Sequence, residues 1–221
     1  MDMTPKNARL LPVAAALALS ATCAWAGGLD SLEQFVKNTR SGKADFTQVV
    51  TSPGKSGQPP RTKTQTGSFE FQRPGKFRFD YRKPFEQTIV ADGQTLWLYD
   101  ADLNQVTARQ QQQVLGSTPA AIVAAAPDLK ALQRDFTLTE EPDQDGQQWV
   151  KAVPKASDGQ LQNIRVGFKS GAAGAELTTL EILDSFDQRS VLTFSNIAVN
   201  VPLPAASFQF KPPAGAAVLR D

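Results

Sequence analysis

The chain has no histidine and a single cysteine, and these absences limit its chemistry. Without histidine there is no Ser-His-Asp triad and no histidine metal site. Cys23 lies in an N-terminal segment that we expect to be removed, which would exclude thiol nucleophiles and thiolate metal clusters. We therefore predict no catalytic residue, no metal and no cofactor. A carboxylate pair could still hydrolyse glycosides. Most acidic residues, such as Asp143 and Asp158, lie in expected turns, and nothing favours that alternative.

The chain also lacks an excess of charge of either sign. It has 23 basic and 22 acidic residues, and the N-terminal segment holds Lys6, Arg9 and Asp2, which leaves 21 of each. A neutral chain has no bulk attraction for nucleic acid or for an anionic membrane. After residue 26, no apolar run approaches the roughly 20 residues of a membrane helix. We predict no nucleic-acid partner.

Residues 1–26 have the pattern of a secretory signal peptide. A charged start precedes the apolar stretch from Leu10 to Ala21, and Ala24-Trp25-Ala26 forms a cleavage site. Lipoprotein leaders usually place leucine three residues before the cysteine and a small residue just before it. Here Ser20 and Thr22 take those places, so we predict a soluble periplasmic product and not a lipid anchor. Residues 27–221 are long enough for one domain with a full core.

The first expected element after the leader is an amphipathic helix. Asp30 and Glu33 have capping-box spacing, and Leu32, Phe35 and Val36 share one face. Basic residues near Arg40 precede Gly42, which we expect to end the helix. Such a helix needs an apolar surface on which to dock.

Alternating patterns then predict strands. Phe69 and Phe71 alternate with polar residues, and Phe77, Phe79 and Tyr81 do the same after a Pro-Gly turn. Further strands are expected at 86–91, 94–100, 103–108, 135–140, 147–153, 161–168, 176–184, 189–200 and 206–210. The fold class is mainly β, a large and strongly curved antiparallel sheet with short helices. Periodicity does not say whether these aromatics form core or line a cavity, nor which face of 94–100 points inward.

One segment interrupts the strands with an unusual helix pattern. Thr118-Pro119 begins a helix, and residues 119–126 have no polar side chain and include Ile122 and Val123. A second short helix is expected from Asp128 through Leu132. A helix that is apolar on all sides must be covered or must face an apolar ligand. We predict that it lies over the concave face of the sheet as a lid.

Several ordered motifs resemble those of the LolA-type periplasmic lipoprotein carriers. They are Phe46-Thr47-Gln48, Arg73-Pro74-Gly75 with Phe77, Phe79 and Tyr81, Leu96-Trp97-Leu98-Tyr99, Thr118-Pro119 and Phe208-Gln209-Phe210-Lys211-Pro212-Pro213. The resemblance implies an incomplete β-barrel of about eleven strands whose helices form a lid. It further implies a carrier, not an enzyme, and we expect it to be a monomer.

In that family the cavity binds the acyl chains of lipoproteins. An inner-membrane lipoprotein-releasing ABC transporter supplies them, and an outer-membrane lipoprotein receptor accepts them. The resemblance implies a lipid cavity lined by Phe69, Phe71, Phe77, Phe79, Tyr81, Ile122 and Val123. It also implies that Arg73 controls the lid by donating hydrogen bonds to lid carbonyls, although a solvated arginine beside a turn is the alternative. An outer-membrane receptor of the same fold and a periplasmic binder of another amphiphile stay open.

Overall fold

The structure is a computed structural model that describes residues 27–54, 57–114, 126–156, 160–171 and 174–220. The expected signal peptide and Ile122 and Val123 of the expected lid lie outside the described residues. No helix in the described ranges is long and apolar enough to cross a membrane.

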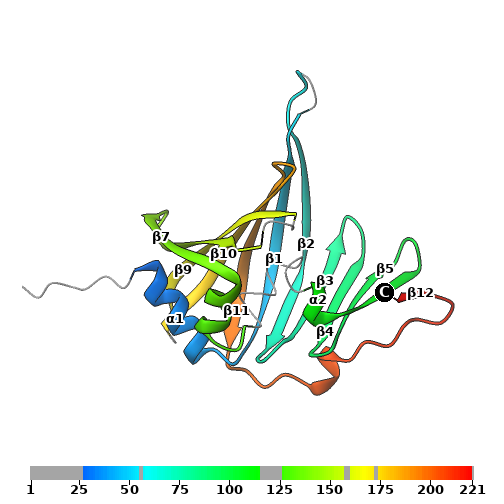
Figure 1. The fold of residues 1–221 in the computed structure, drawn as a ribbon. Coiled ribbons are helices and arrows are strands. Elements are labelled where there is room, and N and C mark those ends of the chain that lie inside the picture. Colours follow the sequence, from blue (N-terminus) through cyan, green and yellow to red (C-terminus); the bar gives the residue numbers. More distant parts are fainter. Residues whose placement is uncertain (1–26, 55–56, 115–125, 157–159, 172–173, 221) are drawn as a thin grey trace, which may run out of the picture.

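All twelve strands of the described chain belong to one sheet (Figure 1). They are β1 (Ser41–Ser52), β2 (Arg61–Gln72), β3 (Lys76–Lys83), β4 (Gln87–Asp92), β5 (Thr95–Asp100), β6 (Gln105–Gln110), β7 (Phe136–Gln144), β8 (Gln147–Pro154), β9 (Leu161–Gly171), β10 (Gly174–Asp184), β11 (Arg189–Val199) and β12 (Ala217–Arg220). Their order is β12-β6-β5-β4-β3-β2-β1-β11-β10-β9-β8-β7. The edge strands β12 and β7 do not pair with each other in the described sheet, so the sheet is open. The predicted fold class is confirmed, with one strand more than expected.

The helices are α1 (Gly28–Asn38), α2 (Gln111–Val114), α4 (Leu129–Asp135) and the 3-10 helix η2 (Ala205–Phe208). Helix α1 packs on β7 to β10 and contacts α4 (Figure 1). It buries the predicted apolar face, Leu32, Phe35 and Val36. We call the face of the sheet that α1 covers the inner face. Asp128 caps α4 by accepting a hydrogen bond of 2.7 Å from the backbone N–H of Ala131, so the second short helix is confirmed.

The ends of α1 differ from the sequence prediction. Its N-cap is Gly27 with no side-chain hydrogen bond, so Asp30 does not form the expected cap, and its C-cap is Thr39. A Cβ atom on Gly28 would lie 2.2 Å from the backbone oxygen of Trp149. The helix therefore begins where only glycine lets it approach β8, and this tertiary contact replaces a local cap. Gly42 lies within β1.

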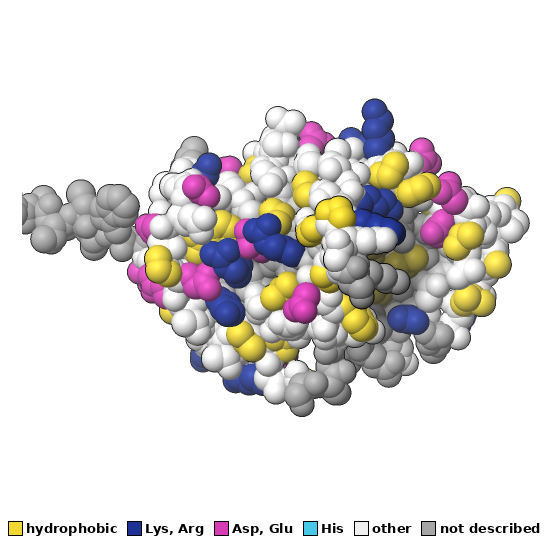
Figure 2. Space-filling model, turned by 90° about the horizontal axis from the view of Figure 1, so that it is seen from above, with side chains coloured by type: hydrophobic (Ala, Val, Ile, Leu, Met, Phe, Trp, Pro, Cys, Tyr) yellow, Lys and Arg dark blue, Asp and Glu magenta, His cyan; other side chains and the backbone are white. Residues whose placement is uncertain are grey.

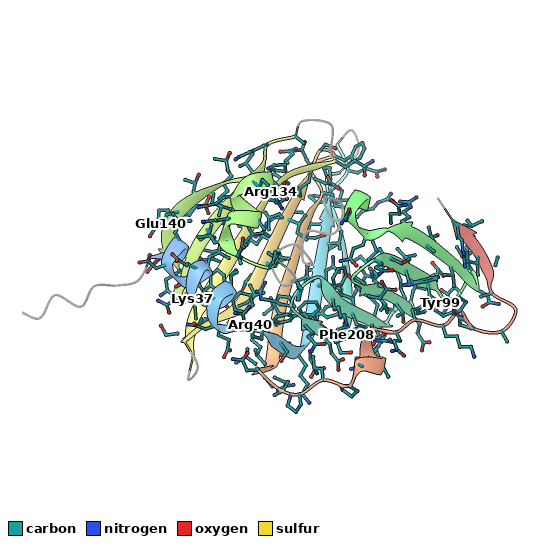
Figure 3. The ribbon with its side chains drawn as sticks, turned by 60° about the horizontal axis from the view of Figure 1, so that its bottom comes forward. Lys37, Arg40, Tyr99, Arg134, Glu140 and Phe208 are labelled. Carbon is teal, nitrogen blue, oxygen red and sulfur yellow. The ribbon has the colours of Figure 1, made fainter. Side chains whose placement is uncertain are left out.

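The C-terminal segment also differs from the prediction. Residues 206–210, expected as a strand, form the end of η2 and an irregular stretch, and β12 was not predicted. Phe208 is buried, and η2 contacts β3 and β4 on the side opposite α1, which we call the outer face. β12 then pairs with β6, the one parallel pairing in the described sheet. Figure 3 shows Phe208 and Tyr99 along the path of this segment.

Candidate functional site

The candidate site is the inner face, where the predicted aromatics of β2 and β3 meet Phe46 of β1. Phe69 lies opposite Phe79 and Phe71 opposite Phe77 in the β2–β3 register, so all four side chains share a face. Their exposed fractions are between 0 and 4%. The Phe69 and Phe79 rings stack with centroids 4.3 Å apart, and Phe46 of β1 meets Phe79 edge-on at 5.7 Å. The structure thus joins these four predicted residues in one apolar cluster.

Tyr81 lies at the polar border of this cluster. Its ring centroid is 5.0 Å from that of Phe46, and its hydroxyl donates a hydrogen bond of 2.9 Å to Oε1 of Gln48. Burial raises the pKa of Tyr81 to about 12, because the charged phenolate would lose its hydration. Tyr81 therefore closes the aromatic row with a neutral polar group.

Strand β5 presents apolar side chains to both faces. Leu96 belongs to the inner cluster. Trp97 and Tyr99 point to the outer face, where both pack against Phe210 with centroids 5.6 and 6.2 Å apart. The question that periodicity left open is thereby answered, since the C-terminal segment covers the second apolar face.

Helix α1 fills much of the inner face. Phe35 contacts Phe71 and Phe168 with ring centroids 6.0 and 5.7 Å apart. Two apolar spaces flank the helix. One is lined by Leu32, Leu132, Phe136, Leu138, Val150, Ala152, Ile164 and Val166. The other lies between α1, β1, β2, β10 and β11. The inner face is thus filled mainly by α1, with a narrow apolar space on either side of it.

Arg73 lies in the β2–β3 turn and is only 8% exposed, unlike a solvated turn arginine. Its Nε donates a hydrogen bond of 2.8 Å to the carbonyl of Thr39, and its Nη1 donates one to the carbonyl of Ala126. The guanidinium carbon lies 5.2 Å from the centroid of the Phe35 ring. Burial, followed by repulsion from Arg40, lowers the pKa of Arg73 to about 10. Arg73 thus connects the turn, the end of α1 and the residue that leads toward α4.

Sequence reasoning missed Gln111 at the start of α2. This side chain is 3% exposed. Its Nε2 donates a hydrogen bond of 2.6 Å to the carbonyl of Gly75, and its Oε1 accepts one of 3.0 Å from the backbone N–H of Gly93. Gln111 therefore holds the turn that carries Arg73 against the β4–β5 turn. No local pattern signals this role, because both partners are distant in sequence.

The described ranges contain no group of three or more His, Cys, Asp or Glu residues that could hold a metal ion. Carboxylates are instead used in ion pairs such as Glu181 with Arg165, at 2.8 Å on the outer face. The site offers apolar surface and hydrogen-bond donors.

Comparison with known proteins places this geometry in a family. The model of the outer membrane lipoprotein carrier protein LolA matches residues 37–211. The chain belongs to the LolA family. It is 68% identical over 205 residues to an outer-membrane lipoprotein carrier protein of Albidiferax ferrireducens, covering 93% of this chain and 96% of the relative. It is 51% identical to one of Leptothrix cholodnii, covering 90% of this chain and 88% of that relative.

A solved structure shares the fold of this LolA-family chain. It is a DUF1329 family protein from Desulfovibrio piger, with a TM-score of 0.51 and 11% sequence identity, covering 82% of this chain and 95% of the other. At that identity the likeness extends to the fold alone.

Proposed function

We propose that this protein carries lipoproteins between membranes through the periplasm and shelters their acyl chains on its inner face. The observation that carries the proposal is the apolar cluster on an open sheet, covered by α1 and not sealed by strand pairing. A helix that packs through side chains can separate from a sheet without breaking any strand hydrogen bonds. The naming of the relatives as outer-membrane lipoprotein carrier proteins supports the same function.

The energetics of acyl chains dictate how such a carrier works. Burying one methylene is worth about 0.8 kcal/mol, so a chain of about 16 carbons contributes on the order of 10 kcal/mol. Neither a membrane nor a carrier releases such a chain into water at a useful rate. Transfer therefore runs from one apolar site directly into another. An inner-membrane ABC transporter would load this protein, and an outer-membrane receptor would unload it.

Arg73 would act as the contact that opens and closes the site. Its hydrogen bonds join Thr39 at the end of α1 to Ala126, so α1 and the chain before α4 stay together in the unloaded form. Loading separates these segments from the sheet and breaks the bonds. The same hydrogen bonds would form again after unloading, and they would offset part of the free energy needed to release the cargo.

Lipoprotein release from inner-membrane vesicles tests this function directly. Added protein is expected to bring acylated lipoprotein into the soluble fraction as a complex that native mass spectrometry identifies. Ala44→Trp would fill the space beside Phe69 and Phe71, and we expect it to reduce release at a folding cost of about 1–3 kcal/mol. Thr47→Trp, on an exposed position of the same strand, is the matched control. Absence of any soluble complex, or a complex with free fatty acid alone, would argue against a lipoprotein carrier.

A further inference from the structure

One face of β2 changes from apolar to cationic along the strand. Alternate residues of a strand share a face, and the β1–β2 register runs without irregularity from Ser41↔Gln72 to Ser52↔Arg61. On the inner face, β2 therefore presents in order Phe71, Phe69, Gly67, Gln65, Lys63 and Arg61. Phe71 and Phe69 are buried, whereas Lys63 and Arg61 are exposed. At about 3.3 Å per residue, Lys63 lies about 20 Å from Phe69.

The neighbouring strand follows the same gradient. Phe46 of β1 is buried, and the next inner-face position is Gln48, which accepts the hydrogen bond of Tyr81. At the next inner-face position after Gln48, Val50 of β1 lies opposite Lys63 of β2. The inner face thus has a buried aromatic end and an exposed end with positive charge.

The cationic end also has an unpaired backbone edge. β2 pairs with β3 only from Thr66 onward, so residues 61–65 pair with β1 alone within the described chain. Figure 1 shows this end of the β1–β2 hairpin projecting beyond the rest of the sheet. A strand edge with free N–H and C=O groups accepts another extended chain.

The side chains at this edge are available to a ligand. Lys63 Nζ lies 4.7 Å from the ring centroid of Phe85, which is 52% exposed in the β3–β4 loop. Arg61 donates a weak hydrogen bond of 3.4 Å to Gln58. Neither cation forms an ion pair with a carboxylate of the described residues. Figure 2 views the molecule from above, the side on which the β1–β2 hairpin projects, and shows basic side chains beside hydrophobic ones.

We propose that residues 61–65 and Phe85, the β2 strip, bind an acidic, extended segment of the cargo polypeptide that follows its acylated end. The inference rests on the proposed carrier function. Acyl chains seated among Phe69 and Phe71 place the polar end of the cargo near Lys63, about one chain length away. The free backbone edge favours a polypeptide over a phospholipid headgroup, because a headgroup has no row of amides with which to pair.

Two synthetic lipopeptides with the same acylated N-terminal cysteine test the β2 strip. One continues in alternating aspartate and serine, and in the other serine replaces every aspartate. We expect the full chain to bind the acidic lipopeptide about fivefold to tenfold more tightly at low salt, as two exposed ion pairs would provide. Arg61→Glu with Lys63→Glu should remove or reverse that preference. Lys169→Glu with Lys211→Glu, at exposed positions elsewhere, gives the same change in net charge and should keep it.

Amide hydrogen exchange gives a second measurement, because a purely electrostatic contact would not protect the backbone amides of the strand. The acidic lipopeptide should slow exchange within residues 61–65. Three results would refute the proposed role of the β2 strip and leave the proposed carrier function intact. They are equal affinity for the two lipopeptides, an unchanged preference in the charge-reversal variant, and unprotected amides in residues 61–65. Failure of both lipopeptides to bind would remove the carrier function and this inference together. Charge-dependent binding to phosphatidylglycerol vesicles, with no preference between lipopeptides, would instead assign the cations to membrane contact.

Discussion

Replacing Arg73 by leucine should trap cargo on the carrier. The substitution removes hydrogen bonds from a buried guanidinium to the carbonyls of Thr39 and Ala126. Hydrogen bonds to a charged group contribute about 1.5–3 kcal/mol each, and the cost of burying the charge offsets part of that. A net loss of about 2 kcal/mol from the closed form corresponds to about thirtyfold in the ratio of closed to open protein.

If the loaded form is open, as the proposed function requires, this loss strengthens cargo binding and slows release. Arg73→Leu is therefore expected to load lipoprotein from inner-membrane vesicles but to pass it to purified outer-membrane receptor about thirtyfold more slowly. Arg73→Lys keeps the charge and loses the planar fork, so its transfer rate should fall between the two. Arg78→Leu is a matched control, because Arg78 pairs with Asp80 on the outer face of the same hairpin.

The assay follows radiolabelled lipoprotein from the isolated carrier complex to the receptor. Urea unfolding of the empty protein shows whether Arg73→Leu is folded under the assay conditions. A transfer rate for Arg73→Leu equal to that of the unsubstituted protein, with both folded, would refute the role of Arg73 in closure.

Three further predictions concern the packing around the site. Phe77→Ala should lower the free energy of unfolding by about 3–5 kcal/mol in urea, since Phe77 has no exposed surface; a loss below about 1 kcal/mol would show a loosely packed ring. Gln111→Ala leaves a carbonyl and an N–H without their partner and should cost about 1–3 kcal/mol by the same measurement, whereas no change would mean that the two turns hold without it. In Tyr99→Phe, which leaves Tyr81 as the sole tyrosine, tyrosinate absorbance should appear with a midpoint near pH 12. Because the folded pKa exceeds the unfolded value of about 10, the stability linked to Tyr81 is complete below pH 10 and falls as the pH rises towards 12; a midpoint near 10 would contradict its burial.

The sequence predicted the aromatic face because alternation is a local signal. Phe69, Phe71, Phe77 and Phe79 share a face in any regular hairpin with this register. It could not assign Leu96 and Trp97 to a face, since both faces of β5 are covered by apolar groups. Whether these rings form core or cavity depends on the position of α1, which periodicity does not encode.

The errors arise where distant contacts override local patterns. Phe208 and Phe210 alternate like a strand, but Pro204 and Pro212 flank them and restrict ladder pairing. The segment instead forms η2 against the outer face. The partners of Arg73 and Gln111 lie up to 53 residues away in sequence, so no local signal identifies them.

The C-terminal segment makes the two halves of the sheet unequal. Phe208 and Phe210 pack on β3 to β5 from outside, whereas β7 to β10 are covered on the inner face by α1, with the short helix α4 against β7. When a fatty tail pushes into the protein, the braced half should behave as a fixed wall. The half covered by helices would then move away from the sheet. The protein would therefore open on one side only, and the apolar site would always be exposed in the same direction.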